Sequence, residues 1–168
     1  MATATPPAVP PAVPSTATHA TFVIERTYDA APARVWAAFA DREAKQQWFS
    51  CMDPSAESHM ELDFRVGGRE VNRIAMPGGP VHRMEATYWD VVPERRFVYS
   101  YAMHVGDAKL SVSLVTVELS PAGAGTRLVF TEQAAFLDGH QEPAERERGT
   151  EIGLERLGEL LRAESASA

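Results

Sequence analysis

The sequence has little cysteine, no long apolar run and fewer basic than acidic residues, and each shortage excludes a class of protein. Cys51 is the only cysteine in 168 residues, so no internal disulfide can form and a reducing, cytoplasmic compartment is expected. No run of about 18 apolar residues occurs, which predicts that the chain does not span a membrane. The net charge of −7 argues against nucleic acid and against anionic membrane surfaces as partners.

The sequence also lacks the short motifs that hold metals or activate nucleophiles. The five histidines lie in separate segments without a spacing such as His-x-x-x-His, so neither a metal nor a cofactor is expected. Cys51 has no partner in a Cys-x-x-Cys pair and is interpreted as an inert thiol. The Gly67-Gly68-Arg69 stretch lacks the Gly-Lys-Ser/Thr ending of a phosphate loop, and Gly-x-Ser-x-Gly does not occur.

The first segment differs in composition from the rest of the chain. Residues 1–19 contain five prolines and no charged residue, with Pro-Pro-Ala-Val repeated, which predicts a disordered or polyproline-like tail. This segment has neither a basic start nor a long apolar block, so a secretory signal is not expected. Residues 20–164 are then predicted to form a single domain, and residues 165–168 a disordered C-terminus.

The pattern within the domain predicts one strand, two short helices, about six further strands and a long helix. Alternating and helical periodicities give the elements, and Gly, Pro and Asp give the turns between them. Gly67-Gly68 predicts a two-residue hairpin, and an apolar phase that slips near Leu114 predicts a bulge. The expected ranges are strand 21–28, helices 32–40 and 42–49, and strands 60–66, 69–76, 81–92, 97–103, 110–119 and about 126–133.

The element around which the chain is organised is its last helix, expected over residues 144–163 and about 30 Å long. Leu154, Leu157 and Leu161 repeat at helical spacing, and Gly149 and Gly153 continue this stripe toward the N-terminus without side-chain bulk. Each glycine costs about 1 kcal/mol relative to alanine in a helix. Two interpretations stay open, one in which the helix packs closely on a sheet and one in which it leaves space for a pocket.

Successive hairpins predict an antiparallel sheet with one apolar face, which only the long helix is large enough to cover. The fold class is therefore α+β, with a curved antiparallel sheet wrapped around the C-terminal helix and two short helices after the first strand. This order is the helix-grip, START-like architecture. The motifs that match one branch of it are Ala-Pro-Ala-Arg-Val-Trp at residues 31–36, Arg-Val-Gly-Gly-Arg at 65–69, Val-Val-Pro-Glu-Arg-Arg at 91–96, Gly-Thr-Arg-Leu at 125–128 and Thr-Glu-Gln at 131–133.

Through these motifs the chain resembles the SRPBCC superfamily and, within it, proteins related to the C-terminal domain of the activator of the Hsp90 ATPase (AHSA1-like). The resemblance implies a cavity between sheet and helix that binds a small, largely hydrophobic molecule. It leaves open a cavity enzyme of the polyketide cyclase or hydratase kind, and a co-chaperone-type protein-interaction module. The separate N-terminal domain of the full-length co-chaperone has no counterpart here, so an Hsp90-type partner is not expected, whereas a homodimer is compatible with the sequence.

Candidate functional residues are polar groups on otherwise apolar faces and the aromatic residues near them. Glu132, Tyr101 and His104 are the candidate acid and base residues of the enzyme alternative. Each has a simpler interpretation, since alternating aromatic residues usually form core and a carboxylate usually lies in water. The predicted cavity-lining residues are Trp36, Phe39, Trp48, Phe97, Tyr99, Tyr101, Met103, Leu128, Phe130, Glu132, Gly149, Gly153 and Leu157.

Overall fold

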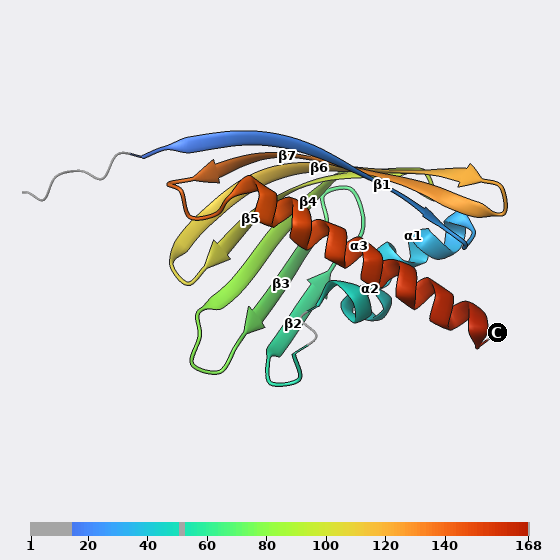
Figure 1. Cartoon of the computed structure of the whole chain (residues 1–168), viewed down its shortest axis with the longest axis horizontal. Coiled ribbons are helices and arrows are strands. Elements are labelled where there is room, and N and C mark those ends of the chain that lie inside the picture. The colour runs from blue at the N-terminus through green and yellow to red at the C-terminus, as the bar shows by residue number, and fades with distance from the viewer. Residues whose placement is uncertain (1–14, 51–52, 168) are drawn as a thin grey trace, which may run out of the picture.

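A curved sheet crossed by one long helix makes up most of the molecule (Figure 1). The computed structural model describes residues 15–50 and 53–167. The elements of this part of the chain follow one another in the predicted order. They are β1 (Ala17–Tyr28), α1 (Pro32–Ala40), α2 (Arg42–Phe49), β2 (Glu57–Leu62), β3 (Arg69–Ala75), β4 (Val81–Val92), β5 (Arg96–Val105), β6 (Ala108–Ala122), β7 (Gly125–Leu137) and α3 (Pro143–Ala166).

The seven strands form one antiparallel sheet in the order β1-β7-β6-β5-β4-β3-β2. Hairpins join β2 through β7 in sequence, and β1 closes the order by pairing with the last strand. Figure 1 shows α3 lying across one face of the curved sheet, with α1 and α2 near its C-terminal half. The predicted helix-grip α+β fold is confirmed, because one helix covers the apolar face of a meandering sheet.

Local sequence signals fix the two short helices, and both occupy the predicted residues. Pro32 stands at the first position of α1, where its missing N–H leaves no hydrogen bond unmade. The Asp41 carboxylate accepts a hydrogen bond from the backbone N–H of Ala44 at 2.8 Å and so caps α2. The indole N–H of Trp48 donates to the carbonyl of Ala38 at 2.9 Å, which holds the two helices together.

The ends of the folded part extend further than the sequence predicted. Residues 17–19 were assigned to a disordered tail, but they pair with β7 in the register Ala17↔Leu137. The Asp138 carboxylate accepts a hydrogen bond from the Thr16 N–H at 2.9 Å, which anchors the start of β1. At the other end, residues 165 and 166 belong to α3 rather than to a disordered C-terminus. The rest of the predicted tail (1–14), Cys51 and residue 168 lie outside the described residues.

The predicted two-residue hairpin at Gly67-Gly68 is wrong. Strands β2 and β3 are joined by residues 63–68, which return to β4 through hydrogen bonds from Gly67 N–H to the Tyr88 carbonyl and from Tyr88 N–H to the Gly68 carbonyl. A Cβ at Gly68 would lie 2.0 Å from the Asp63 carbonyl oxygen. Gly68 is therefore required by a close backbone approach in a longer loop, and Gly67 by its positive φ of 78°.

The predicted bulge near Leu114–Val115 is also wrong. The register of β6 with β7 runs unbroken from Ser111 to Ala122, and the irregularity lies earlier, between Met103 and His104 of β5. The apolar phase of β6 slips without a bulge, because two serines, Ser111 and Ser113, face the interior while Val112 and Leu114 are exposed. These serines bind polar groups under α3, as described below.

The leucine stripe of α3 packs on the sheet as predicted. A third glycine of this helix, Gly158, lies closest to the sheet. Leu154, Leu157 and Leu161 are at most 2% exposed. A Cβ at Gly158 would lie 3.2 Å from the ring of Tyr28 in β1, so the helix meets the sheet most tightly there. The Tyr28 hydroxyl also donates to the Leu154 carbonyl at 2.8 Å, which fixes the height of the helix above β1.

Leu157 is fully buried in this contact, and its truncation tests how α3 is packed. We expect Leu157→Ala to lower the free energy of unfolding by about 2–5 kcal/mol, because the removed methyl groups leave a cavity. Ile152→Ala on the same helix is the control, since Ile152 is 43% exposed. Denaturant unfolding of both variants measures the difference, and equal stability of the two would contradict the assignment of the stripe.

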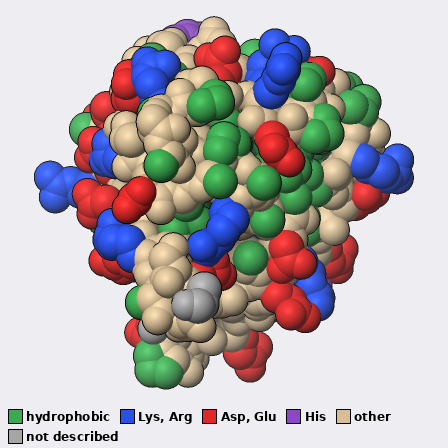
Figure 2. All heavy atoms as spheres, turned by 90° about the vertical axis from the view of Figure 1, so that its right-hand side faces the viewer, with side chains coloured by type: hydrophobic (Ala, Val, Ile, Leu, Met, Phe, Trp, Pro, Cys, Tyr) green, Lys and Arg blue, Asp and Glu red, His purple; other side chains and the backbone are tan. Residues whose placement is uncertain are grey.

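The outer surface mixes charges of both signs. Figure 2, which faces the right-hand side of Figure 1, shows Lys and Arg interspersed with Asp and Glu among small groups of hydrophobic side chains. The described residues on this face thus present no continuous basic surface of the kind that binds a phosphate backbone. No helix in the described part of the chain is long and apolar enough to cross a membrane.

Candidate functional site

A cavity of about 290 Å³ lies between the sheet, α2 and the N-terminal half of α3. Strands β4, β5 and β7 form its floor, and the two helices form its walls. Gly149, an exposed residue, belongs to its rim, and a Cβ there would have no atom within 4 Å. The lining residues are Phe39, Lys45, Trp48, Phe49, Met84, Tyr99, Tyr101, Met103, Phe130, Glu132, Gln141, Glu145, Arg146, Gly149, Thr150, Gly153, Leu154 and Arg156.

The structure brings together most of the residues that the sequence singled out. Of the predicted lining set, the residues that border the cavity are Phe39, Trp48, Tyr99, Tyr101, Met103, Phe130, Glu132, Gly149 and Gly153.

The other four predicted lining residues belong to the surrounding core. Leu128 and Leu157 are fully buried and pack in the main cluster of apolar side chains. Phe97 is fully buried as well, and its ring contacts those of Phe39 at 5.1 Å and Trp36 at 5.7 Å between centroids. These residues therefore pack behind the side chains that line the cavity and do not border the cavity themselves.

His104, a predicted acid or base candidate, does not border the cavity. It stands at the irregularity between β5 and β6, where the register shifts after Met103. Ordinary alternation along β5 places His104 on the opposite face of the strand from Tyr99, Tyr101 and Met103. Glu132 and Tyr101, the other two candidates, are both buried in the cavity floor.

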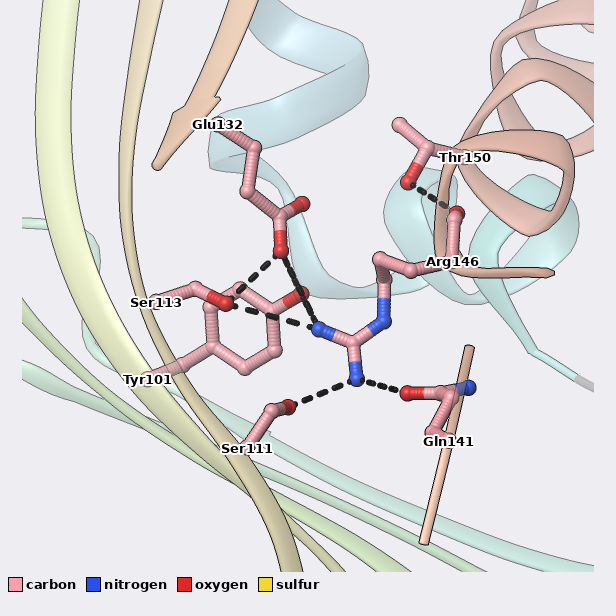
Figure 3. Close-up of polar contacts among 7 residues, drawn as sticks. All are labelled: Tyr101, Ser111, Ser113, Glu132, Gln141, Arg146 and Thr150. Atoms are coloured by element: carbon pink, nitrogen blue, oxygen red, sulfur yellow. Dashed lines mark hydrogen bonds and ion pairs between the residues drawn. The ribbon is translucent and has the colours of Figure 1, made fainter. Parts of the chain in front are cut away.

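The polar part of the floor is a cluster around Arg146, shown in Figure 3. Its guanidinium contacts the Glu132 Oε1 at 3.1 Å, and a second nitrogen donates to the Ser111 hydroxyl at 2.8 Å and to the Gln141 side-chain oxygen at 2.6 Å. The same Oε1 accepts hydrogen bonds from the hydroxyls of Tyr101 at 2.8 Å and Ser113 at 2.7 Å. We call these six residues (Tyr101, Ser111, Ser113, Glu132, Gln141 and Arg146) the Arg146 cluster.

Burial makes the Arg146 cluster energetically sensitive. Arg146 is 6% exposed and Glu132 is 1% exposed, so both charges have lost most of their hydration. Desolvation of this kind is offset only when the ions pair closely and their remaining hydrogen-bonding groups are satisfied. Four side chains besides Glu132 accept from the guanidinium, and its carbon lies 5.3 Å from the centroid of the Tyr101 ring.

A second buried ion pair lies toward β3. Lys45 Nζ of α2 contacts Glu70 Oε2 at 2.6 Å, and the Tyr88 hydroxyl also donates to this oxygen. Lys45 is 3% exposed and Glu70 is fully buried. In both pairs the cation comes from a helix and the carboxylate from the sheet, so each pair fastens a helix to the strands beneath it.

Tyr99 stands between the two ion pairs. Its ring centroid lies 5.5 Å from that of Tyr88 and 6.0 Å from that of Tyr101. The hydroxyls of these two neighbours are engaged with Glu70 and Glu132, whereas no hydrogen bond joins the Tyr99 hydroxyl to another described residue. The three tyrosines thus form a row in which Tyr99 and Tyr101 border the cavity and Tyr88 lies outside it, and the Tyr99 hydroxyl has no partner among the described residues.

The environment keeps these phenols protonated. Burial raises the pKa of Tyr88, Tyr99 and Tyr101 well above the ordinary value of 10. The nearby carboxylates raise the pKa of Tyr88 and Tyr101 further, because a phenolate would be repelled, although Arg146 partly opposes this effect at Tyr101. The row therefore supplies hydroxyl groups that donate hydrogen bonds, and it does not supply phenolates at neutral pH.

Comparison with known proteins places the chain in a family. The family of activator of Hsp90 ATPase homolog 1-like proteins matches residues 29–164. The chain belongs to this family. The resemblance to the AHSA1-like branch of the SRPBCC superfamily is thereby confirmed, and proteins of this fold typically carry a hydrophobic cavity.

Several solved structures resemble this AHSA1-like chain. A protein from Rhizobium loti is 46% identical, with a TM-score of 0.81 over 87% of this chain and 99% of that one. An uncharacterised protein from Rhizobium leguminosarum is 42% identical, with a TM-score of 0.83 over 90% and 99% of the two chains. A protein from Chromobacterium violaceum is 28% identical, with a TM-score of 0.70 over 84% and 96%. A search of the curated proteins gives no significant match.

Sequence reasoning about this AHSA1-like protein missed Arg146, Lys45 and Glu70. A signal existed for Arg146, because it lies at helical spacing before Gly149 and Gly153, on the same face of α3 as Leu157. A charged residue on this inward face indicates a buried charge. Glu70 had a weaker signal, as a carboxylate in phase with the inward positions of β3. The pairing of each charge depends on strands and helices distant in sequence, so its partner was not predictable from periodicity.

Proposed function

We propose that this protein binds a small, largely apolar molecule in the cavity between the sheet and α3. The observation that carries the proposal is the combination of an apolar space with a small number of fixed polar groups on its floor. Phe130, Met84 and Met103 provide apolar surface, and the Arg146 cluster together with Tyr99 provides directional hydrogen bonding. Small-molecule sites commonly have this composition, and the cavity volume is close to the smallest usual for them.

The glycines of α3 support the same proposal. Of the two interpretations of Gly149 and Gly153, space beside the helix fits the geometry better, because a Cβ would meet nothing within 4 Å at Gly149 and only the Trp48 ring, at 4.0 Å, at Gly153. Gly158, in contrast, is where the helix packs closely on Tyr28. A helix that tolerates two costly glycines where no close contact needs them leaves room for a bound molecule.

Filling the space from Gly153 tests the proposal. We expect wild-type protein to bind the neutral fluorescent probe N-phenylnaphthylamine, and Gly153→Leu to weaken this binding by about tenfold or more, since a leucine would occupy the cavity. Gly153→Ala is the matched control. Its Cβ makes only an ordinary contact with Trp48, so the probe should still bind and the melting temperature should not fall.

A second variant guards against overpacking at Gly153. Gly149→Leu places the same bulk at the exposed rim, where it cannot strain the core, and it should also weaken probe binding while the protein stays folded. The proposal is contradicted if the wild type binds no probe, or if folded Gly153→Leu and Gly149→Leu proteins bind it as tightly as the wild type.

A further inference from the structure

The carboxylate of Glu132 has one oxygen that the protein leaves without a partner. Its Oε1 accepts from Tyr101, Ser113 and Arg146, whereas its Oε2 is buried and contacts no hydrogen-bond donor among the described residues. In Figure 3 this second oxygen points away from Ser113, on the side of the site where Thr150 of α3 lies. Glu132 and Thr150 both border the cavity.

An unpaired carboxylate oxygen in such a place calls for a hydrogen-bond donor. A buried acceptor without a partner is unfavourable, and the penalty is larger for a charged group. The three donors to Oε1 hold the carboxylate in one orientation, so Oε2 cannot turn toward them. No described residue supplies a donor to it, so a group that enters the cavity is the donor we infer.

The two buried cations that border the cavity are already paired with carboxylates. Lys45 and Arg146 are paired with Glu70 and Glu132, respectively, at 2.6 and 3.1 Å. Two further charged residues, Glu145 and Arg156, border the cavity and are of opposite sign. A ligand carboxylate next to Glu132 would be buried beside a like charge while both buried cations are already paired, which is strongly unfavourable.

Tyr99 supplies the complementary group. Its hydroxyl has no partner within the described protein, and it belongs to the cavity floor next to Tyr101. Because it stays protonated, it can donate a hydrogen bond to an oxygen of the ligand. A hydroxyl group is the simplest ligand group that donates to Glu132 and accepts from Tyr99 at once.

We propose that the bound molecule is an uncharged alcohol or phenol on an apolar skeleton, and that Glu132 Oε2 and the Tyr99 hydroxyl together recognise its hydroxyl group. This inference rests on the proposed function, since it names the ligand class of the same cavity. It makes Glu132 a specificity-determining residue. A site with a buried hydrogen-bond acceptor binds an analogue that lacks the hydrogen-bond donor much more weakly.

Three compounds with the same ring skeleton test the inference by displacing N-phenylnaphthylamine at neutral pH. Naphthol donates and accepts a hydrogen bond, methoxynaphthalene only accepts, and naphthoate is a carboxylate. We expect naphthol to bind about tenfold or more tightly than methoxynaphthalene, the usual scale for one hydrogen bond to a charged group, and naphthoate to bind most weakly.

Variants then assign the effect to its residues. In Glu132→Gln the three donors keep the amide oxygen in the place of Oε1, so an N–H₂ replaces Oε2 and the preference should reverse toward methoxynaphthalene. Tyr99→Phe should weaken both compounds to a similar degree, since both accept from Tyr99. Tyr88→Phe is the matched control, because Tyr88 does not border the cavity and its loss should leave the wild-type preference unchanged.

The outcomes separate this inference from the proposed function. If the wild type binds the probe but naphthol and methoxynaphthalene displace it equally, solvent serves Oε2 and the inference is wrong while the cavity remains a binding site. If naphthoate binds most tightly, the cavity prefers an anion and the proposed ligand class is wrong. If the probe does not bind at all, the proposed function itself fails. Should Glu132→Gln not fold, the wild-type preference and the Tyr99→Phe result still decide the matter.

Discussion

Replacing Arg146 by methionine is expected to lower the free energy of unfolding by about 3–5 kcal/mol. The change removes one partner of an ion pair whose members are 6% and 1% exposed, and it leaves the Glu132 carboxylate buried without a cation. It also frees the hydroxyl of Ser111, which accepts from the guanidinium at 2.8 Å. Chemical denaturation monitored by tryptophan fluorescence measures the loss.

Two controls show whether the loss of stability comes from the unpaired Glu132 charge or only from the loss of an arginine side chain. Arg127→Met removes the partner of Glu25 in an exposed ion pair, and its effect should be far smaller because water solvates the remaining carboxylate. A double variant, Arg146→Met with Glu132→Leu, should recover most of the lost stability, since both buried charges are then absent. Our description of the cluster is wrong if Arg146→Met is no less stable than Arg127→Met.

Stability is expected to fall steeply above pH 10, by about 5 kcal/mol per pH unit at its steepest. All four tyrosines of the chain are buried, and burial is the main cause that raises the pKa of each above 10. Their stabilising contribution is therefore fully present below the unfolded pKa of about 10. As the pH rises beyond it, the unfolded chain releases protons that the folded chain retains, and the contribution is lost.

Domains of ordinary stability, about 5–15 kcal/mol, would unfold within a few pH units of this point. Tyrosinate absorbance followed alongside circular dichroism tests the prediction, because the tyrosines should ionise together with the loss of structure. The control is the same titration in denaturant, where the tyrosines should ionise near pH 10. Tyrosinate formation near pH 10 in a protein that keeps its native circular dichroism would show that the row is open to solvent.

Much of the fold was predictable because its signals are local. The helices at 32–40 and 42–49 and the strand at 81–92 have the predicted bounds, since Pro32, Asp41 and Pro93 mark their ends. The resemblance to a known branch supplied the arrangement of the elements. The hairpin at Gly67-Gly68 was mispredicted because Gly68 serves a backbone approach to Asp63, which no local pattern reveals.

The candidate site was predictable only in part, because it depends on pairing across the fold. Glu132 was recognised as a carboxylate on an apolar strand face, but its partner Arg146 comes from α3. The inward serines of β6 were read as a phase slip, although Ser113 donates to Glu132 at 2.7 Å. A polar residue at an inward position indicates a buried hydrogen-bond network only when its partners are also known. The partners lie on other helices and strands, so the pattern of one strand does not reveal them.

The methionine methyl NMR spectrum, recorded with and without saturating naphthol, tests most directly whether a small molecule occupies the space between sheet and α3. Met84 and Met103 border the cavity, whereas Met60 is buried away from it and Met76 lies in the turn after β3. We predict that the methyl resonances of Met84 and Met103 shift while those of Met60 and Met76 stay in place. Unchanged resonances for Met84 and Met103, or shifts of equal size at these two and at Met60 and Met76, would contradict the proposed site.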